Sequence, residues 1–174
     1  MIKTILLATD LSVFTSCVLN HASELAKQHN AKLVVAHAIE PLGTLGHALL
    51  HAYLTPKTTH QLTTAGITAM IQEVKAQVID LLTDEYMEGE VDLLKLGEVI
   101  VRAGQPIDVI LEIAKDIEAD LIVVGSHSPT ASGQGSLGTV AQKVINNAKV
   151  PVYVVPSNPM NWQQNDSQNQ MRLW

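Results

Sequence analysis

Short, continuous apolar runs alternate with longer segments of helical periodicity along most of this chain. The runs lack the alternating polar positions of a half-exposed strand, so they predict strands that are buried on both faces. We expect these strands at Ile2–Thr9, Lys32–Ile39, Gly97–Arg102, Asp120–Val124 and Pro151–Val155. Strands of this kind occur almost only in parallel sheets that helices cover on both sides.

The segments between the runs place apolar residues three and four positions apart, which is the spacing of a helix with one buried side. They predict helices over about 13–29 and 58–88, a third lined by residues 107–114 and a fourth lined by 140–148. Ser12 is a candidate N-cap of the first helix. Because crossovers between parallel strands are right-handed, the sequence predicts an α/β fold. We expect a doubly wound, five-stranded parallel sheet of order 3-2-1-4-5 with helices on both faces.

The pattern accounts for one domain of ordinary size, residues 1–156. Within it, residues 40–57 are expected to form a loop or a short-helix insertion. Residues 157–174 differ in composition and are expected to form an Asn/Gln-rich C-terminal tail.

Composition narrows the partners and the compartment. The net charge of −6 and the lack of a basic cluster argue against nucleic acid as a partner. No apolar run is long enough to span a membrane, and the N-terminal run is too short for a signal peptide, so we expect no membrane insertion. Cys17 is the only cysteine, which suits a reducing compartment and a small buried residue of the first helix. The sequence therefore predicts a cytoplasmic protein.

A polar stretch, GSHSPTASGQGSLGT at residues 125–139, follows the fourth strand. It holds four glycines and many hydroxyl residues but no Lys or Arg. Such a loop can surround an anion with backbone N–H groups, together with the amides at the start of the next helix. Ligands of open parallel sheets bind where the strand order reverses, so Asp10 at the end of the first strand should face this loop. The alternative is that the loop is only a long surface connection.

Several familiar sites are excluded by missing residues. The chain has no GxxxxGK[ST] motif and no GxGxxG after its first strand, so neither a P-loop nor a dinucleotide site is expected. Aromatic residues make up only 3% of the chain, which is too few to suggest a flavin carrier. A phosphate-accepting receiver domain would need a carboxylate where the third strand ends in Val101 and Arg102. No nucleophile and base can be paired, so a turnover enzyme is poorly supported.

The histidines give weaker signals. His47 and His51 lie four residues apart with His60 beyond them, but no carboxylate or cysteine completes a metal site. Their segment is expected to act as a lid or a partner contact. His127 lies in the polar loop, where it would contact a phosphate or face solvent, and His37 is expected at the edge of the core.

Four stretches of the chain resemble the universal stress protein family over residues 1–156. They are ILLATDLS, LVVAHAIEP, GQPIDVILEIAKDIEADLIVVGSHS and GTVAQKVINNAKVPVYVVP. The nucleotide-binding branch of that family carries G-x2-G-x9-G-[ST] after the fourth strand. Here the motif falls on Gly125, Ser128, Gly138 and Thr139, so the spacing is kept and Ser128 replaces the middle glycine.

The resemblance implies a ligand and the residues that would hold it. Ala8, Thr9 and Asp10 would line an adenosine pocket, and the main chain near Ala38 would meet the base. Gly125 and Ser128 belong to the phosphate loop, and Gly138, Thr139 and Val140 would hold the phosphates. The implied cofactor is ATP, or AMP or ADP, with Mg²⁺ to offset the phosphate charge in a loop without cationic side chains. The resemblance implies that the bound nucleotide acts as a regulatory ligand.

The resemblance also implies a homodimer through the last strand, residues 151–155, with a dimer of dimers as a further option. A bare edge strand such as PVYVV favours pairing with a second copy. An unknown protein partner would respond to the ligand. Two alternatives stay open: a nucleotide-free dimeric scaffold of the same fold, which Ser128 favours, and an enzyme that hydrolyses ATP slowly.

Overall fold

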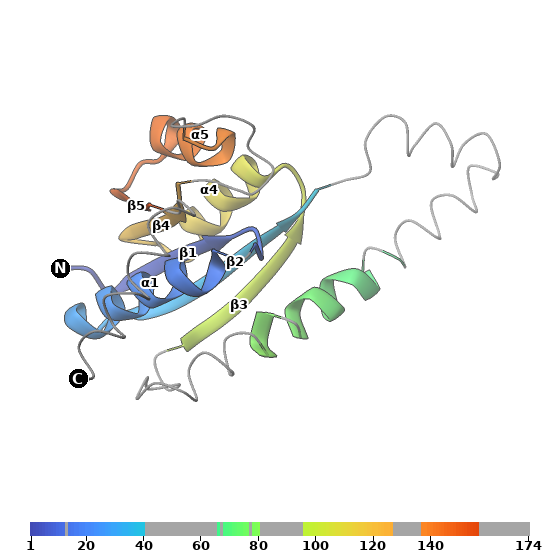
Figure 1. Cartoon of the computed structure of the whole chain (residues 1–174), viewed down its shortest axis with the longest axis horizontal. Coiled ribbons are helices and arrows are strands. Elements are labelled where there is room, and N and C mark those ends of the chain that lie inside the picture. Colours follow the sequence, from blue (N-terminus) through green and yellow to red (C-terminus); the bar gives the residue numbers. More distant parts are fainter. Residues whose placement is uncertain are drawn as a thin grey trace, which may run out of the picture.

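A computed structural model describes residues 1–12, 14–40, 66, 68–76, 78–80, 96–126 and 137–156 of the chain (Figure 1). The elements follow the predicted alternation of strands and helices. They are β1 (Thr4–Thr9), α1 (Thr15–His29), β2 (Lys32–Ile39), β3 (Leu96–Ala103), α4 (Pro106–Asp116), β4 (Leu121–Gly125), α5 (Thr139–Asn147) and β5 (Val152–Val155). Residues 68–76 and 78–80 are also helical and fall within the predicted helix 58–88.

The strands form one five-stranded sheet of order β3-β2-β1-β4-β5, as the sequence predicts. Every neighbouring pair is parallel. Thr9, at the end of β1, pairs with His37 of β2, and Ala8 pairs with both Ala36 and Val124. The strand order reverses between β1 and β4, so the carboxyl ends of these strands form the edge at which a ligand site is expected.

Each face of the sheet has its own core, because successive residues of a strand point to opposite sides. Ile5 and Leu7 of β1 belong to a buried cluster that includes α1 and Val78. Leu6, between them in the sequence, belongs to a second cluster with residues of α4 and α5. Figure 1 shows α1 on one side of the sheet and α4 and α5 on the other. Aliphatic burial on both faces therefore holds the site elements in place.

The start of α1 differs from the prediction. Phe14, and not Ser12, is the N-cap residue, and no side chain caps the helix there. Ser12 lies two residues before the N-cap, where its carbonyl oxygen accepts from Thr15 N at 2.9 Å and its Oγ accepts from Phe14 N at 3.4 Å. Ser12 thus closes the turn that leads into the helix, and α1 begins later than the apolar spacing predicts.

Two composition-based predictions can be compared with the described residues. Cys17 is partly buried against the α1 side of the core, and this burial raises the pKa of its thiol. Within the part of the chain that the structure describes, no helix is long and apolar enough to cross a membrane. The predicted insertion beyond residue 40, loop residues 127–136 and the tail 157–174 lie outside the described residues.

Candidate functional site

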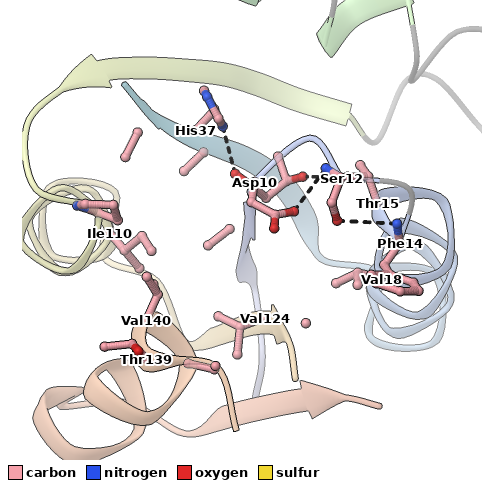
Figure 2. Close-up of a pocket in the computed structure, with 18 of the residues that line it drawn as sticks. Asp10, Ser12, Phe14, Thr15, Val18, His37, Ile110, Val124, Thr139 and Val140 are labelled. Atoms are coloured by element: carbon pink, nitrogen blue, oxygen red, sulfur yellow. Dashed lines mark hydrogen bonds between the residues drawn. The ribbon is translucent and has the colours of Figure 1, made fainter. Parts of the chain in front are cut away.

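A cavity of about 440 Å³ opens at the carboxyl ends of β1, β2 and β4. Figure 2 shows side chains of α1, α4 and α5, among them Val18, Ile110 and Thr139, arranged around the end of β1. The cavity therefore lies where the strand order reverses. Its lining consists of Ala8, Thr9, Asp10, Ser12, Phe14, Thr15, Val18, Ala36, His37, Ala38, Glu40, Pro106, Ile110, Val124, Gly125, Gly138, Thr139, Val140 and Ala141.

The structure brings the predicted site residues together, apart from Ser128. The predicted residues that line the cavity are Ala8, Thr9, Asp10, Ala38, Gly125, Gly138, Thr139 and Val140. Ser128 and His127 lie outside the described residues, as do His47, His51 and His60. The geometry thus places the end of β1 and the start of α5 around one cavity.

Asp10 is held in a tight turn after β1. Its Oδ1 accepts a hydrogen bond from Ser12 N at 3.0 Å. Leu11 between them has φ 57°, a left-handed conformation that is uncommon for a residue with a branched side chain. Thr9 Oγ1 accepts from Leu11 N at 3.1 Å and lies 3.0 Å from Thr15 Oγ1. These bonds fix the turn, so the Asp10 carboxylate is positioned before any ligand arrives.

His37 is a pocket residue whose role there the sequence did not predict. Its Nδ1 lies 2.8 Å from the carbonyl oxygen of Thr9 (Figure 2). A carbonyl oxygen only accepts, so Nδ1 carries the hydrogen of this bond. The half-buried ring therefore ties the end of β1 to β2. The parallel register of the two strands, which pairs Thr9 with His37, is the signal that a sequence reading lacks.

The first residues of α5 line the cavity and carry main-chain donors that have no partner within the helix. The first intrahelical bond runs from Gln142 N to Gly138 O at 2.9 Å, so the N–H groups of Thr139, Val140 and Ala141 precede it. The N-cap residue Gly138 has no side chain with which to cap this terminus, and no acidic residue lies in the first turn of α5. All three residues line the cavity. Free amides at a helix start, with the positive end of the helix dipole, are suited to an anion.

A main-chain clamp fixes the two ends of the polar loop. Ser126 N donates to Val155 O of β5 at 2.8 Å, and Gly138 N donates to Ser126 O at 2.8 Å. Gly138 itself has φ −57° and ψ 145°, an extended conformation that any residue can adopt. The helix start is therefore held against the end of the sheet through Ser126.

The charged side chains that line the cavity are Asp10 and Glu40, and both are exposed. No Lys or Arg lines the cavity among the described residues. Within the same residues no group of three His, Cys, Asp or Glu side chains is placed to hold a metal ion. A divalent cation at this site would therefore depend on ligand oxygens in addition to the Asp10 carboxylate.

Comparison of the sequence with protein-family profiles and with individual proteins gives the same family. The profile of the Universal stress protein family matches residues 1–156. A universal stress protein of Thermus aquaticus, from the 3′ region of a QAH/OAS sulfhydrylase gene, is 31% identical over 156 residues. That alignment covers 89% of this chain and 99% of the relative.

Solved structures share the fold. The structure of MJ0577, a universal stress protein of Methanocaldococcus jannaschii, has a TM-score of 0.69 at 23% identity and covers 91% of this chain and 98% of its own. A universal stress protein in complex with cAMP has a TM-score of 0.56 at 24% identity, with 90% and 98% covered. The universal stress protein of Archaeoglobus fulgidus in complex with dAMP has a TM-score of 0.52 at 23% identity, with 88% and 98% covered.

Proposed function

The chain belongs to the universal stress protein family, and we propose that its cavity binds an adenine nucleotide as a regulatory ligand. The observation that carries the proposal is the start of α5: Thr139–Ala141, whose N–H groups precede the first bond within the helix, line a cavity at the reversal of strand order. The structural neighbours solved with cAMP and with dAMP support an adenine nucleotide as the class of ligand.

In this proposal each part of the nucleotide has its own residues. The phosphates lie against Gly138, Thr139 and Val140, with Gly125 and Ser128 as further members of the phosphate loop. The adenosine lies along Ala8, Thr9 and Asp10, and its base reaches the main chain near Ala38. The ligand is ATP, ADP or AMP. Mg²⁺ accompanies the polyphosphates, because no Lys or Arg of the described residues lines the cavity to offset their charge.

The proposed role is that of a cytoplasmic binding protein that acts through a partner, and it includes a homodimer through residues 151–155. β5 lies at the edge of the sheet and pairs only with β4 among the described strands. Tyr153 of that strand is 37% exposed. An edge strand with an exposed aromatic side chain favours pairing with a second copy.

Calorimetric titration of the full chain with AMP and with ATP and Mg²⁺ tests the proposal. Saturable binding supports it, and no heat of binding at millimolar nucleotide would refute it and favour the nucleotide-free scaffold. Gly138→Asp sharpens the test. Asp is a good N-cap, so it should preserve the helix while its carboxylate competes with phosphate for the same amides.

The matched control is Gly138→Asn, which has the same shape and also caps a helix but carries no charge. We expect Gly138→Asp to weaken nucleotide binding by at least about tenfold relative to Gly138→Asn. Equal affinities in the two variants would mean that the phosphates do not lie at the start of α5.

A further inference from the structure

His37 is the one histidine of the described residues that lines the cavity, and its side chain is half-buried there. Leu33 and Val35, on the same side of β2, belong to the core beneath α1, so His37 continues that row at the carboxyl end of the strand. Its Nδ1 lies 2.8 Å from Thr9 O, across the register that pairs these two residues (Figure 2). The ring is therefore fixed at the cavity by β1 and β2 together.

The hydrogen bond to Thr9 O is compatible with either charge state of the ring. Histidine donates from Nδ1 both as the neutral tautomer that carries its hydrogen there and as the cation, which carries a hydrogen on each nitrogen. Acidification therefore adds a proton at Nε2 without requiring the bond to Thr9 to break. Because histidines in general change charge between about pH 5 and pH 8, His37 can change the charge of the cavity at nearly constant geometry.

The other groups around the cavity determine what this change would do. Asp10 follows β1 and Glu40 follows β2, and both exposed carboxylates line the cavity. Arg102 of β3 forms an ion pair with Asp116 of α4 at 2.8 Å and is not part of the lining. On the elements that pack on the His37 side of the sheet, the described charged or titratable groups outside the lining are Cys17, His21, Glu24, Lys27 and His29 of α1 and Glu73, Lys75 and Asp80 of the helical residues 68–76 and 78–80. As a cation, His37 would therefore be the only positively charged side chain of the described lining.

We propose that His37 makes anion binding in this cavity pH-dependent, because its protonated ring attracts the phosphate of the ligand and its neutral ring does not. The inference rests on the proposed function, since it concerns the charge of the same cavity. The phosphate is proposed to lie at Thr139–Ala141, next to β4, and β1 separates β4 from β2. Neighbouring strands are about 4.8 Å apart, so the ring and the phosphate are separated by about 10 Å. At that distance, in a medium between bulk water and a partly buried site, one unit of charge changes affinity by a factor of about two to ten.

Calorimetric titration of the full chain with cAMP at about pH 8 and about pH 6 tests the proposal. The phosphate diester of cAMP keeps about one negative charge over this range, whereas the monoester of AMP itself titrates near pH 6. We expect the Kd for cAMP to fall by at least about twofold at the lower pH, with proton uptake on binding that appears as a dependence of the heat on the buffer. Adenosine, which has no phosphate, is the ligand control and should show a smaller change.

Binding of cAMP with the same Kd at both pH values and no proton uptake would overturn the inference while leaving the proposed function standing. If cAMP, AMP and ATP with Mg²⁺ all fail to bind at both pH values, the proposed function is refuted, and the inference with it.

His37→Asn locates the effect. The Asn amide places an N–H near the position of Nδ1, so the bond to Thr9 O can be kept while the titration is lost. We expect the Kd of this variant for cAMP to be nearly the same at both pH values. The matched control is His29→Asn, which removes an exposed histidine of α1 outside the lining and should keep the pH dependence of the parent.

Thermal unfolding reports whether the variants are folded, and His37→Gln is a second variant without a titrating ring if Asn lowers Tm. A folded His37 variant that keeps the full pH dependence of the parent would show that another group is responsible and would overturn the assignment to His37.

Discussion

Replacing Thr139 by proline removes one proposed phosphate donor without removing the helix. Thr139 is the first residue of α5, a position where proline is well tolerated. The residue before a proline must be extended, and Gly138 already has ψ 145°. No described residue accepts a hydrogen bond from Thr139 N, so the substitution breaks no bond within that part of the chain. We therefore expect stability to change by only about 0.5 kcal/mol.

The loss of affinity can be estimated from the bond that disappears. A hydrogen bond to a charged group contributes about 1.5–3 kcal/mol, which corresponds to a change in Kd of about 10-fold to 150-fold. Calorimetric titration with AMP measures Kd, and thermal unfolding measured by circular dichroism reports whether the fold is intact. Loss of affinity without loss of Tm is the expected result.

The matched control is Thr139→Val, which keeps the N–H and the branched shape but lacks the hydroxyl group. A difference between the proline and valine variants isolates the main-chain donor from the side chain. If the two variants bind AMP equally well, this amide does not contact the ligand and the proposed position of the phosphates is wrong.

Three further predictions concern stability and assembly. The Asp120 carboxylate accepts from Lys3 N at 2.6 Å and from Thr4 N at 3.0 Å, and these bonds lower its pKa below the ordinary 3.8. The stabilisation of the folded state by this carboxylate is therefore present above pH 3.8 and lost as the pH falls through the lowered pKa. In Asp120→Asn the free energy of unfolding should therefore fall less steeply as the solution is acidified. Gly104 has φ +155°, and a Cβ there would lie 2.8 Å from Val109 Cγ2, so Gly104→Ala should cost about 1–3 kcal/mol in urea unfolding. Tyr153→Asp should shift sedimentation from dimer to monomer, because a strand pair across a two-fold axis would bring the two new charges together.

Each of these predictions has a result that contradicts it. If the free energy of unfolding depends on acid pH in the same way in Asp120→Asn, the pKa of Asp120 is the same in the folded and unfolded chains. A Gly104→Ala variant as stable as the parent would show that the β3–α4 turn relaxes around the new methyl group. If Tyr153→Asp still sediments as a dimer, β5 does not form the proposed interface.

The sheet could be predicted from sequence because its determinants are local. Uninterrupted apolar strands such as residues 32–39 leave few alternatives to a covered parallel sheet, and the right-handed crossover rule restricts the strand order. The placement of Asp10 and Gly138 at one cavity followed from the same rule, because it concerns strand ends and not side chains. The family resemblance also predicted that Asp10 and Gly138 lie at one ligand site.

What the sequence could not supply depends on contacts between distant residues. The bond from His37 to Thr9 O exists because β1 and β2 adopt one particular register. The shift of the N-cap from Ser12 to Phe14 depends on the left-handed turn at Leu11, which propensity does not favour. Both features shape the cavity, so the sequence predicted where the cavity lies but did not predict the hydrogen bonds around it.

The clamp at Ser126 has a consequence for how this site can change over evolutionary time. Gly138 N donates to Ser126 O at 2.8 Å, so this bond closes a loop directly after the carboxyl end of β4. The entropy cost of closing a loop rises by only about 0.6 kcal/mol for each doubling of its length, so insertions between Ser126 and Gly138 should change the folding free energy little. We therefore expect the length of chain between these two residues to vary among relatives while the sheet and α5 stay the same.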